Sequence, residues 1–211
     1  MQSAKTQRAR KKESTRQTLK QAAQHCFARD GWHGTSVGSI AQQAGVAHGT
    51  FYVHFPTKEA LMDELLAEFN GVLAARLTPL LEAAPGSPRR RATTTFEPQL
   101  RAAAKLLLDY WSEHRDFVRA YAERMGGSIG LSALRDGINP PAEQLVRGQL
   151  ERLLAGSGAP SRLAALAAQG LLALWLRIAL QAVFNQDVRR ADAVEALTRM
   201  TIGAVDALRK Q

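Results

Sequence analysis

Hydrogen-bonding side chains are concentrated in one short segment of the chain, residues 48–58, whose sequence is His-Gly-Thr-Phe-Tyr-Val-His-Phe-Pro-Thr-Lys. Imidazole, hydroxyl and ammonium groups of this kind form hydrogen bonds with base edges and phosphate oxygens of nucleic acid. The small residues Gly49 and Thr50 would let a helix approach base edges closely. The sequence shows neither a Ser/His/Asp set nor a glycine-rich phosphate loop, so we expect a binding protein and not an enzyme.

Two short helices and a tight turn must position this segment. Thr35 or Ser36 offers an N-cap for the first helix, and Gly45 ends it. The second helix is expected over residues 47–54 and stops before a proline. A glycine turn, an apolar corner residue and an apolar inner face are typical of a helix-turn-helix; here the corner is Val46 and the inner face holds Phe51 and Phe55.

The predicted DNA-binding residues share small or polar side chains. The start of the second helix would face the major groove, and the margins would lie near phosphates. Three core helices that bind nothing, or a packing role for single members of the set, are the structural alternatives. The predicted set is Thr35, Ser36, His48, Gly49, Thr50, Tyr52, His54 and Lys58.

The combined spacing over residues 14–66 resembles the TetR family of bacterial transcriptional regulators. The matching positions are Gly31, Thr35, Ile40-Ala41, Ala44-Gly45-Val46, Gly49-Thr50-Phe51-Tyr52, His54-Phe55 and Lys58-Glu59-Ala60-Leu61. The resemblance implies all-α homodimers with an N-terminal DNA-binding domain and a larger C-terminal ligand and dimerisation domain. Most members are repressors that lose DNA affinity when a small ligand binds.

Carried over by position, the resemblance makes Tyr52 a phosphate contact and Lys58 the lysine at the start of the fourth helix. Two positions depart from the family pattern. Gly38 stands where some members have a long polar side chain, which puts a base contact from the first short helix in doubt. Ala47 replaces a frequent serine cap, and such a loss costs roughly 0.5–2 kcal/mol.

Charge is unevenly distributed along the 211 residues, whose net charge is +9. Residues 1–61 hold nine lysines and arginines and three acidic residues, so this part alone carries most of the excess. We predict a flexible basic arm over residues 1–12 that could follow phosphates or enter a minor groove. A helix-turn-helix domain over 13–60 and a ligand-binding and dimerisation domain over 61–211 would follow it.

A single cysteine, Cys26, excludes an internal disulfide, and its place on an apolar helical face predicts a core residue, not a metal ligand. We expect no metal and no cofactor. Residues 84–91, rich in proline and arginine, predict a loop.

The rest of the chain has helical spacing, which predicts an all-α fold. Its aromatic and basic residues could line a cavity for a small molecule or fill the core. Arg177 interrupts an apolar helix and, if it faced a cavity, would suit an anionic or carbonyl ligand; a rim position or a pair with an acid is the alternative. The predicted ligand-binding set is Trp111, His114, Phe117, Tyr121, Arg124, Trp175 and Arg177.

The helix expected over residues 161–184 is apolar nearly all round. Together with the last helix, which begins near residue 190, it suits an intermolecular four-helix bundle, with burial inside a monomer as the alternative. Its longest uncharged stretch, residues 163–176, is shorter than the ~18–20 residues that span a bilayer. No apolar signal segment follows the basic N-terminus, so we expect a cytoplasmic protein with no membrane contact.

The leading hypothesis is a homodimeric repressor that a small hydrophobic effector releases from a palindromic, double-stranded DNA operator. The alternative is a DNA-binding dimer without small-molecule sensing, whose C-terminal domain recruits a protein partner.

Overall fold

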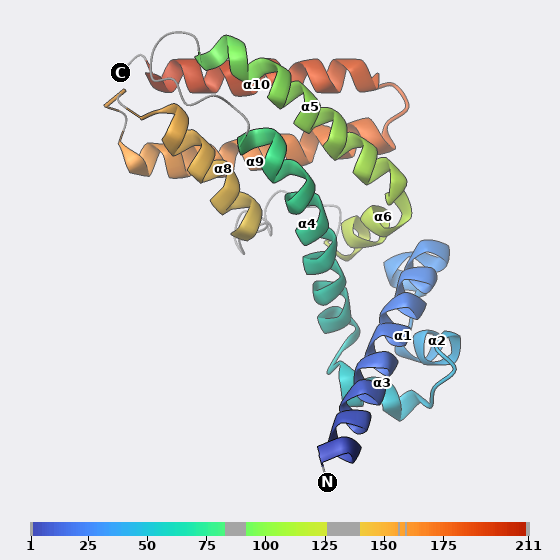
Figure 1. The fold of residues 1–211 in the computed structure, drawn as a ribbon. Helices are drawn as coiled ribbons and strands as arrows, with labels where there is room; N and C mark the ends of the chain where they lie inside the picture. The colour runs from blue at the N-terminus through green and yellow to red at the C-terminus, as the bar shows by residue number, and fades with distance from the viewer. Residues whose placement is uncertain (1, 83–91, 126–139, 156, 159, 210–211) are drawn as a thin grey trace. The chain divides into compact units, whose positions relative to one another are not determined.

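The structure, a computed structural model, describes residues 2–82, 92–125, 140–155, 157–158 and 160–209. Within these ranges every regular element is a helix, which confirms the predicted all-α fold (Figure 1). The helices are α1 (Gln2–Gly34), α2 (Val37–Gln43), α3 (His48–His54), α4 (Lys58–Glu82), α5 (Ala92–Glu113), α6 (Arg115–Arg124), α8 (Pro140–Leu153), α9 (Ser161–Phe184) and α10 (Arg190–Arg209). The loop predicted at 84–91 lies outside the described residues.

The chain divides into two compact units. Unit 1 comprises residues 1–69 and 114–129, and unit 2 comprises residues 70–113 and 130–211. Unit 1 therefore contains α1, α2, α3, the first part of α4 and α6. The sequence places the boundary between the DNA-binding domain and the C-terminal domain at residue 60, which would assign α6 to the C-terminal domain.

The core of unit 1 follows the apolar spacing of α1. Leu19, Ala22, Ala23, Cys26 and Phe27 recur on one helical face, and none of them is more than 4% exposed. Against this face pack side chains from α2, α3 and α4, namely Ile40, Phe51, Phe55, Leu61, Met62 and Leu65. Burial of each large apolar side chain contributes about 1.5–3 kcal/mol, so this face fixes the positions of the short helices.

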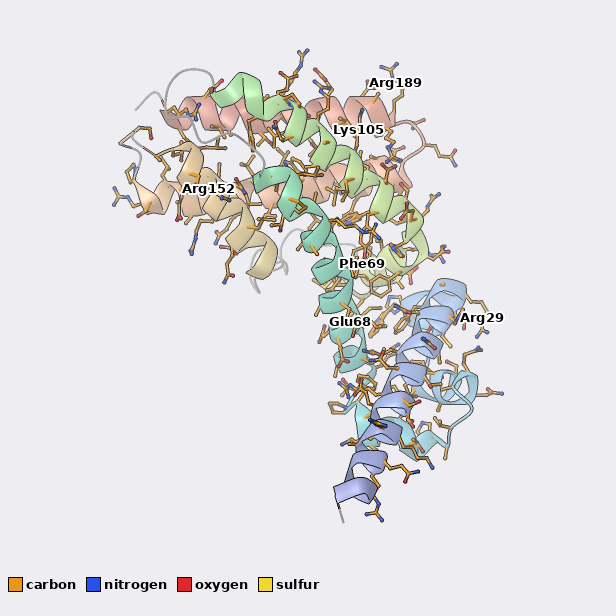
Figure 2. All side chains as sticks on the ribbon, viewed as in Figure 1. Arg29, Glu68, Phe69, Lys105, Arg152 and Arg189 are labelled. Carbon is orange, nitrogen blue, oxygen red and sulfur yellow. The ribbon has the colours of Figure 1, made fainter. Side chains whose placement is uncertain are left out.

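Helix α6 joins unit 1 through small and aromatic side chains. Ala120 is fully buried in the same core, and Phe117 packs against it. The ring centroids of Phe117 and Phe69 are 5.4 Å apart. In Figure 2, Glu68 and Phe69 mark the part of α4 that belongs to this unit. The alanine lets the backbones of α6 and α1 come close, which a larger side chain would prevent.

The amino-terminal part of α1 differs from the predicted flexible arm. The helix begins at Gln2 and is continuous until a kink at Gly31, where φ is 69° and ψ is −174°. Residues 2–30 contain no glycine or proline and are rich in Ala, Lys, Arg and Gln, all of which favour helix. The positive charge that the sequence assigned to an arm therefore lies on a helix.

In unit 2, α10 packs against α5 and α9, and α8 packs against α9. Arg101 of α5 forms an ion pair with Glu195 of α10 at 2.6 Å. Trp175 of α9 donates its indole N–H to Thr201 of α10 at 3.0 Å. Exposed basic side chains on these helices or beside them include the labelled Lys105, Arg152 and Arg189 (Figure 2).

The bounds of α9 agree with the predicted helix, 161–184. By length and composition alone this helix could cross a membrane: its most apolar 18-residue window has a mean hydropathy of 1.8, and 22% of that window is buried. The sequence estimate ended the apolar stretch at Arg177, whereas the helix continues to Phe184. One such helix is weak evidence for a membrane protein, because a core helix of a soluble protein meets the same criteria.

Candidate DNA-binding site

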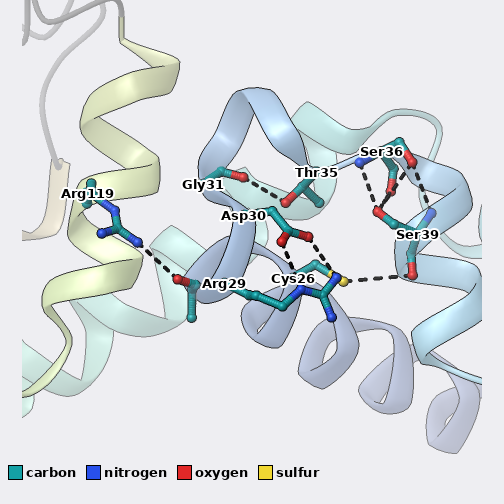
Figure 3. A network of polar contacts seen from close by, with 9 residues as sticks. Cys26, Arg29, Asp30, Gly31, Thr35, Ser36, Ser39 and Arg119 are labelled. Carbon is teal, nitrogen blue, oxygen red and sulfur yellow. Dashed lines mark hydrogen bonds and ion pairs between the residues drawn. The ribbon is translucent and has the colours of Figure 1, made fainter.

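Helix α2 begins with a reciprocal capping arrangement. The Ser36 hydroxyl accepts a hydrogen bond from the backbone N–H of Ser39 at 3.0 Å, and the backbone N–H of Ser36 donates to the Ser39 hydroxyl at 3.0 Å (Figure 3). The sequence left Thr35 and Ser36 open as caps, and the structure selects Ser36. Two otherwise unpaired amides are satisfied in this way, which fixes the start of the helix.

The turn between α2 and α3 depends on a glycine. Gly45 has φ of 65°, a left-handed conformation in which a side chain is strained, although the space around it is open. The next residue, Val46, donates its backbone N–H to the carbonyl of Ala41 at 3.0 Å and packs against the core of unit 1. The turn has the predicted form.

Helix α3 has one face inside the core and one face in solvent. Phe51 and Phe55 are at most 1% exposed. The outer face shows His48, Gly49, Tyr52 and Val53, all exposed. The rings of His48 and Tyr52 pack edge to face with centroids 5.4 Å apart. Ala47 stands at the N-cap without a side-chain hydrogen bond, as predicted from its type.

The side chains of two predicted DNA-binding residues form hydrogen bonds within unit 1. Thr35 is 2% exposed, and its hydroxyl donates to the carbonyl of Gly31 at 2.7 Å. The Lys58 ammonium donates to the carbonyls of Trp32 at 2.8 Å and Thr35 at 2.7 Å, and it lies 3.9 Å from the centroid of the Trp32 ring. Burial lowers the pKa of Lys58. These contacts support the segment before α2, and they leave the buried side chain of Thr35 turned away from solvent.

His54 is half-buried at the end of α3. Its Nδ1 is buried and has no hydrogen-bond partner among the described residues. Burial lowers the pKa of His54, and the positive charges of Lys12 and Arg16 lower it further. Both effects favour the neutral imidazole over the imidazolium, and in the neutral ring one nitrogen donates and the other accepts.

Charged side chains that the sequence did not single out hold α1 against α3 and α4. Arg16 donates to the carbonyl of His54 at 2.5 Å and pairs with Glu64. Lys20, only 4% exposed, pairs with Glu64 at 3.3 Å and with Glu68. Burial alone would lower the pKa of Lys20, but hydrogen bonds from its ammonium to Glu68 and Glu64 outweigh it and raise the pKa.

Helix α6 supports the junction between α1 and α2. The Glu123 carboxylate accepts a hydrogen bond from the backbone N–H of Trp32 at 2.8 Å. It occupies the space beside Gly31 so closely that a Cβ there would lie 2.5 Å from a carboxylate oxygen. Arg119 donates to the carbonyl of Ala28 at 3.0 Å (Figure 3). No local signal predicts these contacts, because Glu123 and Trp32 are 91 residues apart.

The predicted ligand-binding residues are divided between the two units. His114, Phe117, Tyr121 and Arg124 belong to unit 1, where Arg124 pairs with Asp63 and lies over the Trp32 ring at 5.4 Å. Burial raises the pKa of Tyr121. In unit 2 lie Trp111, which is buried, Trp175, which donates to Thr201, and Arg177, which is exposed.

Among the described residues, no group of three or more His, Cys, Asp or Glu could hold a metal ion. Cys26 is fully buried, which confirms its predicted place in the core. Its thiol is 3.8 Å from the carbonyl oxygen of Ser39, and burial raises the pKa of the thiol.

Residues 19–65 match the model of the family described as bacterial regulatory proteins, tetR family. Among curated relatives, the repressor KstR2 of Mycolicibacterium smegmatis is 37% identical over 83 residues, which are 39% of this chain and 40% of KstR2. The transcriptional regulator YuxN of Bacillus subtilis is 33% identical over 92 residues, which are 44% of this chain and 28% of YuxN. The chain thus covers well under half the length of these relatives.

Solved structures extend the likeness to the whole fold. A proposed transcriptional regulator from Pseudomonas aeruginosa PAO1 is similar with a TM-score of 0.66 and 26% identity, over 94% of this chain and 93% of that one. A tetR-family transcriptional regulator from Streptomyces coelicolor has a TM-score of 0.66 and 22% identity, over 93% and 82%. These relatives are regulators of transcription and not enzymes. Residues 19–65 thus belong to the TetR family of bacterial regulatory proteins, and the fold of the chain is similar to that of solved transcriptional regulators.

Proposed function

We propose that this chain binds operator DNA as a homodimeric repressor and that a small hydrophobic effector releases it. The observation that carries the DNA part is the two-sided character of α3. Its phenylalanines are anchored in the core, and the opposite face shows uncovered small, polar and apolar groups to solvent. Such a face can enter a major groove, because no bulky charged side chain keeps the helix away from base edges.

A salt-dependent titration of the full chain against the DNA upstream of its own gene tests this function. Tyr52→Phe removes a hydroxyl proposed to contact a phosphate, which should weaken binding by about 1.5 kcal/mol, roughly tenfold. Thr50→Ala should weaken it as well. Thr18→Ala, which removes an exposed hydroxyl on α1, is the matched control and should bind normally. Wild-type affinity in both α3 variants would contradict the assignment.

Dimerisation through α9 and α10 would bring two copies of α3 to one operator. Leu166 of α9 and Met200 of α10 are 65% and 53% exposed, so each presents an apolar side chain that a second copy could cover. Gly170 and Gly203 on the same helices are exposed, with open space where a Cβ would stand, which suits close helix contact. A two-fold pair would place the recognition helices in successive major grooves, about 34–36 Å apart.

Light scattering after gel filtration tests the dimer. Leu166→Glu should shift the particle from twice the chain mass to the chain mass, because a buried unpaired carboxylate is costly. Val72→Glu changes an exposed valine of α4 in the same way and should leave the dimer intact. A monomeric wild-type chain would overturn this part of the proposal.

Unit 2 supplies candidate polar groups for an effector. Gln99 Oε1, Trp111 Nε1 and Gln149 Nε2 are buried without a hydrogen-bond partner among the described residues. Unpaired buried groups of this kind cost free energy, and a ligand that pairs with them recovers it. We propose an effector that is mostly apolar with a few hydrogen-bonding atoms, since such groups orient ligands in apolar sites.

A thermal-shift screen of small hydrophobic compounds tests the effector. A compound that binds the folded chain raises its melting temperature by mass action. Gln149→Leu should reduce that shift while stabilising the free protein. No stabilising compound, together with intact DNA binding, would favour the alternative in which unit 2 recruits a protein partner. The relatives named as transcriptional regulators support a cytoplasmic location for this chain.

A further inference from the structure

Val53 is the most exposed large apolar side chain among the described residues, at 66%. It lies on the solvent face of α3, beside Tyr52, which is 52% exposed. A single exposed valine is ordinary on a protein surface. On a face proposed to enter a major groove, however, a valine limits what it can lie against, because an isopropyl group cannot form a hydrogen bond with a phosphate or a base edge.

The neighbours of Val53 leave it accessible. Gly49 precedes it by four residues and therefore lies on the same face of the helix. Gly49 has no side chain, and nothing lies within 4 Å of the place where its Cβ would stand. The Tyr52 ring packs against His48 at 5.4 Å and against Phe51 at 5.5 Å. The isopropyl group thus stands beside bare backbone, where a DNA surface can reach it.

The major groove offers one apolar group to such a side chain, the 5-methyl group of thymine. The other edges in the groove present hydrogen-bond donors and acceptors, which a valine would desolvate without pairing. We propose that Val53 is a specificity-determining residue that contacts a thymine methyl, so that each half-site has thymine at one fixed position. This inference rests on the proposed function and adds which base α3 selects at one position.

The test uses the full chain and duplexes enriched from a random pool. Each thymine of the enriched site is replaced in turn by deoxyuridine, which removes only the methyl group, and affinity is measured by fluorescence anisotropy. At one symmetric pair of positions the replacement should weaken wild-type binding about fourfold per thymine, the factor for withdrawing one methyl group from water. Replacement in both half-sites should weaken it about fifteenfold.

In Val53→Ala, deoxyuridine at that pair of positions should have no further effect, while its effect at all other positions is unchanged. Val72→Ala, which shortens an exposed valine of unit 2, should bind as wild type does. The salt dependence of Val53→Ala binding should equal that of the wild type, because a methyl contact releases no counterions.

The outcomes separate the two proposals. If no duplex is enriched, the DNA-binding function itself fails. If a duplex is enriched and Val53→Ala keeps the wild-type sensitivity to deoxyuridine at every position, the function stands and the thymine contact is overturned. An unchanged affinity in Val53→Ala would overturn it as well.

Discussion

Gly31→Ala should destabilise unit 1 for two separable reasons. The first is conformational: φ of 69° with ψ of −174° lies in a region that only glycine adopts readily, and such strain costs of order 1–3 kcal/mol. The second is steric, because the new Cβ would lie 2.5 Å from a Glu123 carboxylate oxygen. Glu123 would have to give up the backbone N–H of Trp32, and a hydrogen bond to a charged group contributes about 1.5–3 kcal/mol.

A double-mutant cycle separates the two costs. In the wild-type background, Gly31→Ala should lower the free energy of unfolding by about 2.5–6 kcal/mol, measured by urea unfolding. In a Glu123→Ala background only the conformational part remains, so the coupling between the two positions should be about 1.5 kcal/mol or more. Gly45→Ala is the matched control: its φ is 65° but nothing lies within 4 Å of its Cβ, so it should not couple to Glu123. Equal costs of Gly31→Ala in both backgrounds would refute the close approach of α6.

Two further predictions follow from α3. Ala47→Ser should raise the free energy of unfolding by about 0.5–2 kcal/mol, because it supplies the missing N-cap, and the urea midpoint should rise accordingly. An unchanged midpoint would argue against the helix start at His48. Burial, together with Lys12 and Arg16, holds the pKa of His54 below 6.5, so the unfolded chain binds a proton more readily there than the folded chain. That contribution to stability is present above about pH 6.5 and is lost as pH falls through the lower folded pKa. His54→Asn should flatten this acid loss in a pH series of unfolding curves, whereas His25→Asn, which changes an exposed histidine, should not.

The local features of the DNA-binding unit could be predicted because they depend on neighbouring residues. The capping hydroxyl of Ser36, the turn at Gly45 and the uncapped start at Ala47 each follow from a residue type and its immediate context. Thr57 caps α4 in the same local way, since its hydroxyl accepts from the backbone N–H of Ala60 at 3.1 Å. Hydrogen bonds of this kind span a few residues, so a sequence pattern is enough to anticipate them.

The partners of charged side chains could not be predicted in the same way. Arg124, one of the predicted ligand-binding residues, pairs with Asp63, which is 61 residues away. Glu123 gave no signal at all, because its role depends on the backbone of Trp32 and on the missing side chain of Gly31. Such contacts arise only when α6 is packed on α1, and the apolar pattern of α6 does not say which helix it will cover.

The positions of the lysines and arginines in residues 1–61 determine which part of unit 1 can attract the phosphates of DNA. Of the nine basic residues in residues 1–61, four are committed within the chain, since Arg16, Lys20 and Lys58 bind internal partners and Arg29 pairs with Asp30 at 2.7 Å. The outer face of α3 carries no lysine or arginine. Exposed cations among the described side chains of the amino-terminal turns of α1 include Arg8, Arg10, Lys11 and Lys12, and the last is close enough to His54 to lower its pKa. In the proposed complex these turns flank the end of α3 and contact phosphates, while α3 itself supplies specificity. Each of these contacts should contribute about 0.9 to the slope of log affinity against log salt concentration, and changes on the outer face of α3 should leave that slope unaltered.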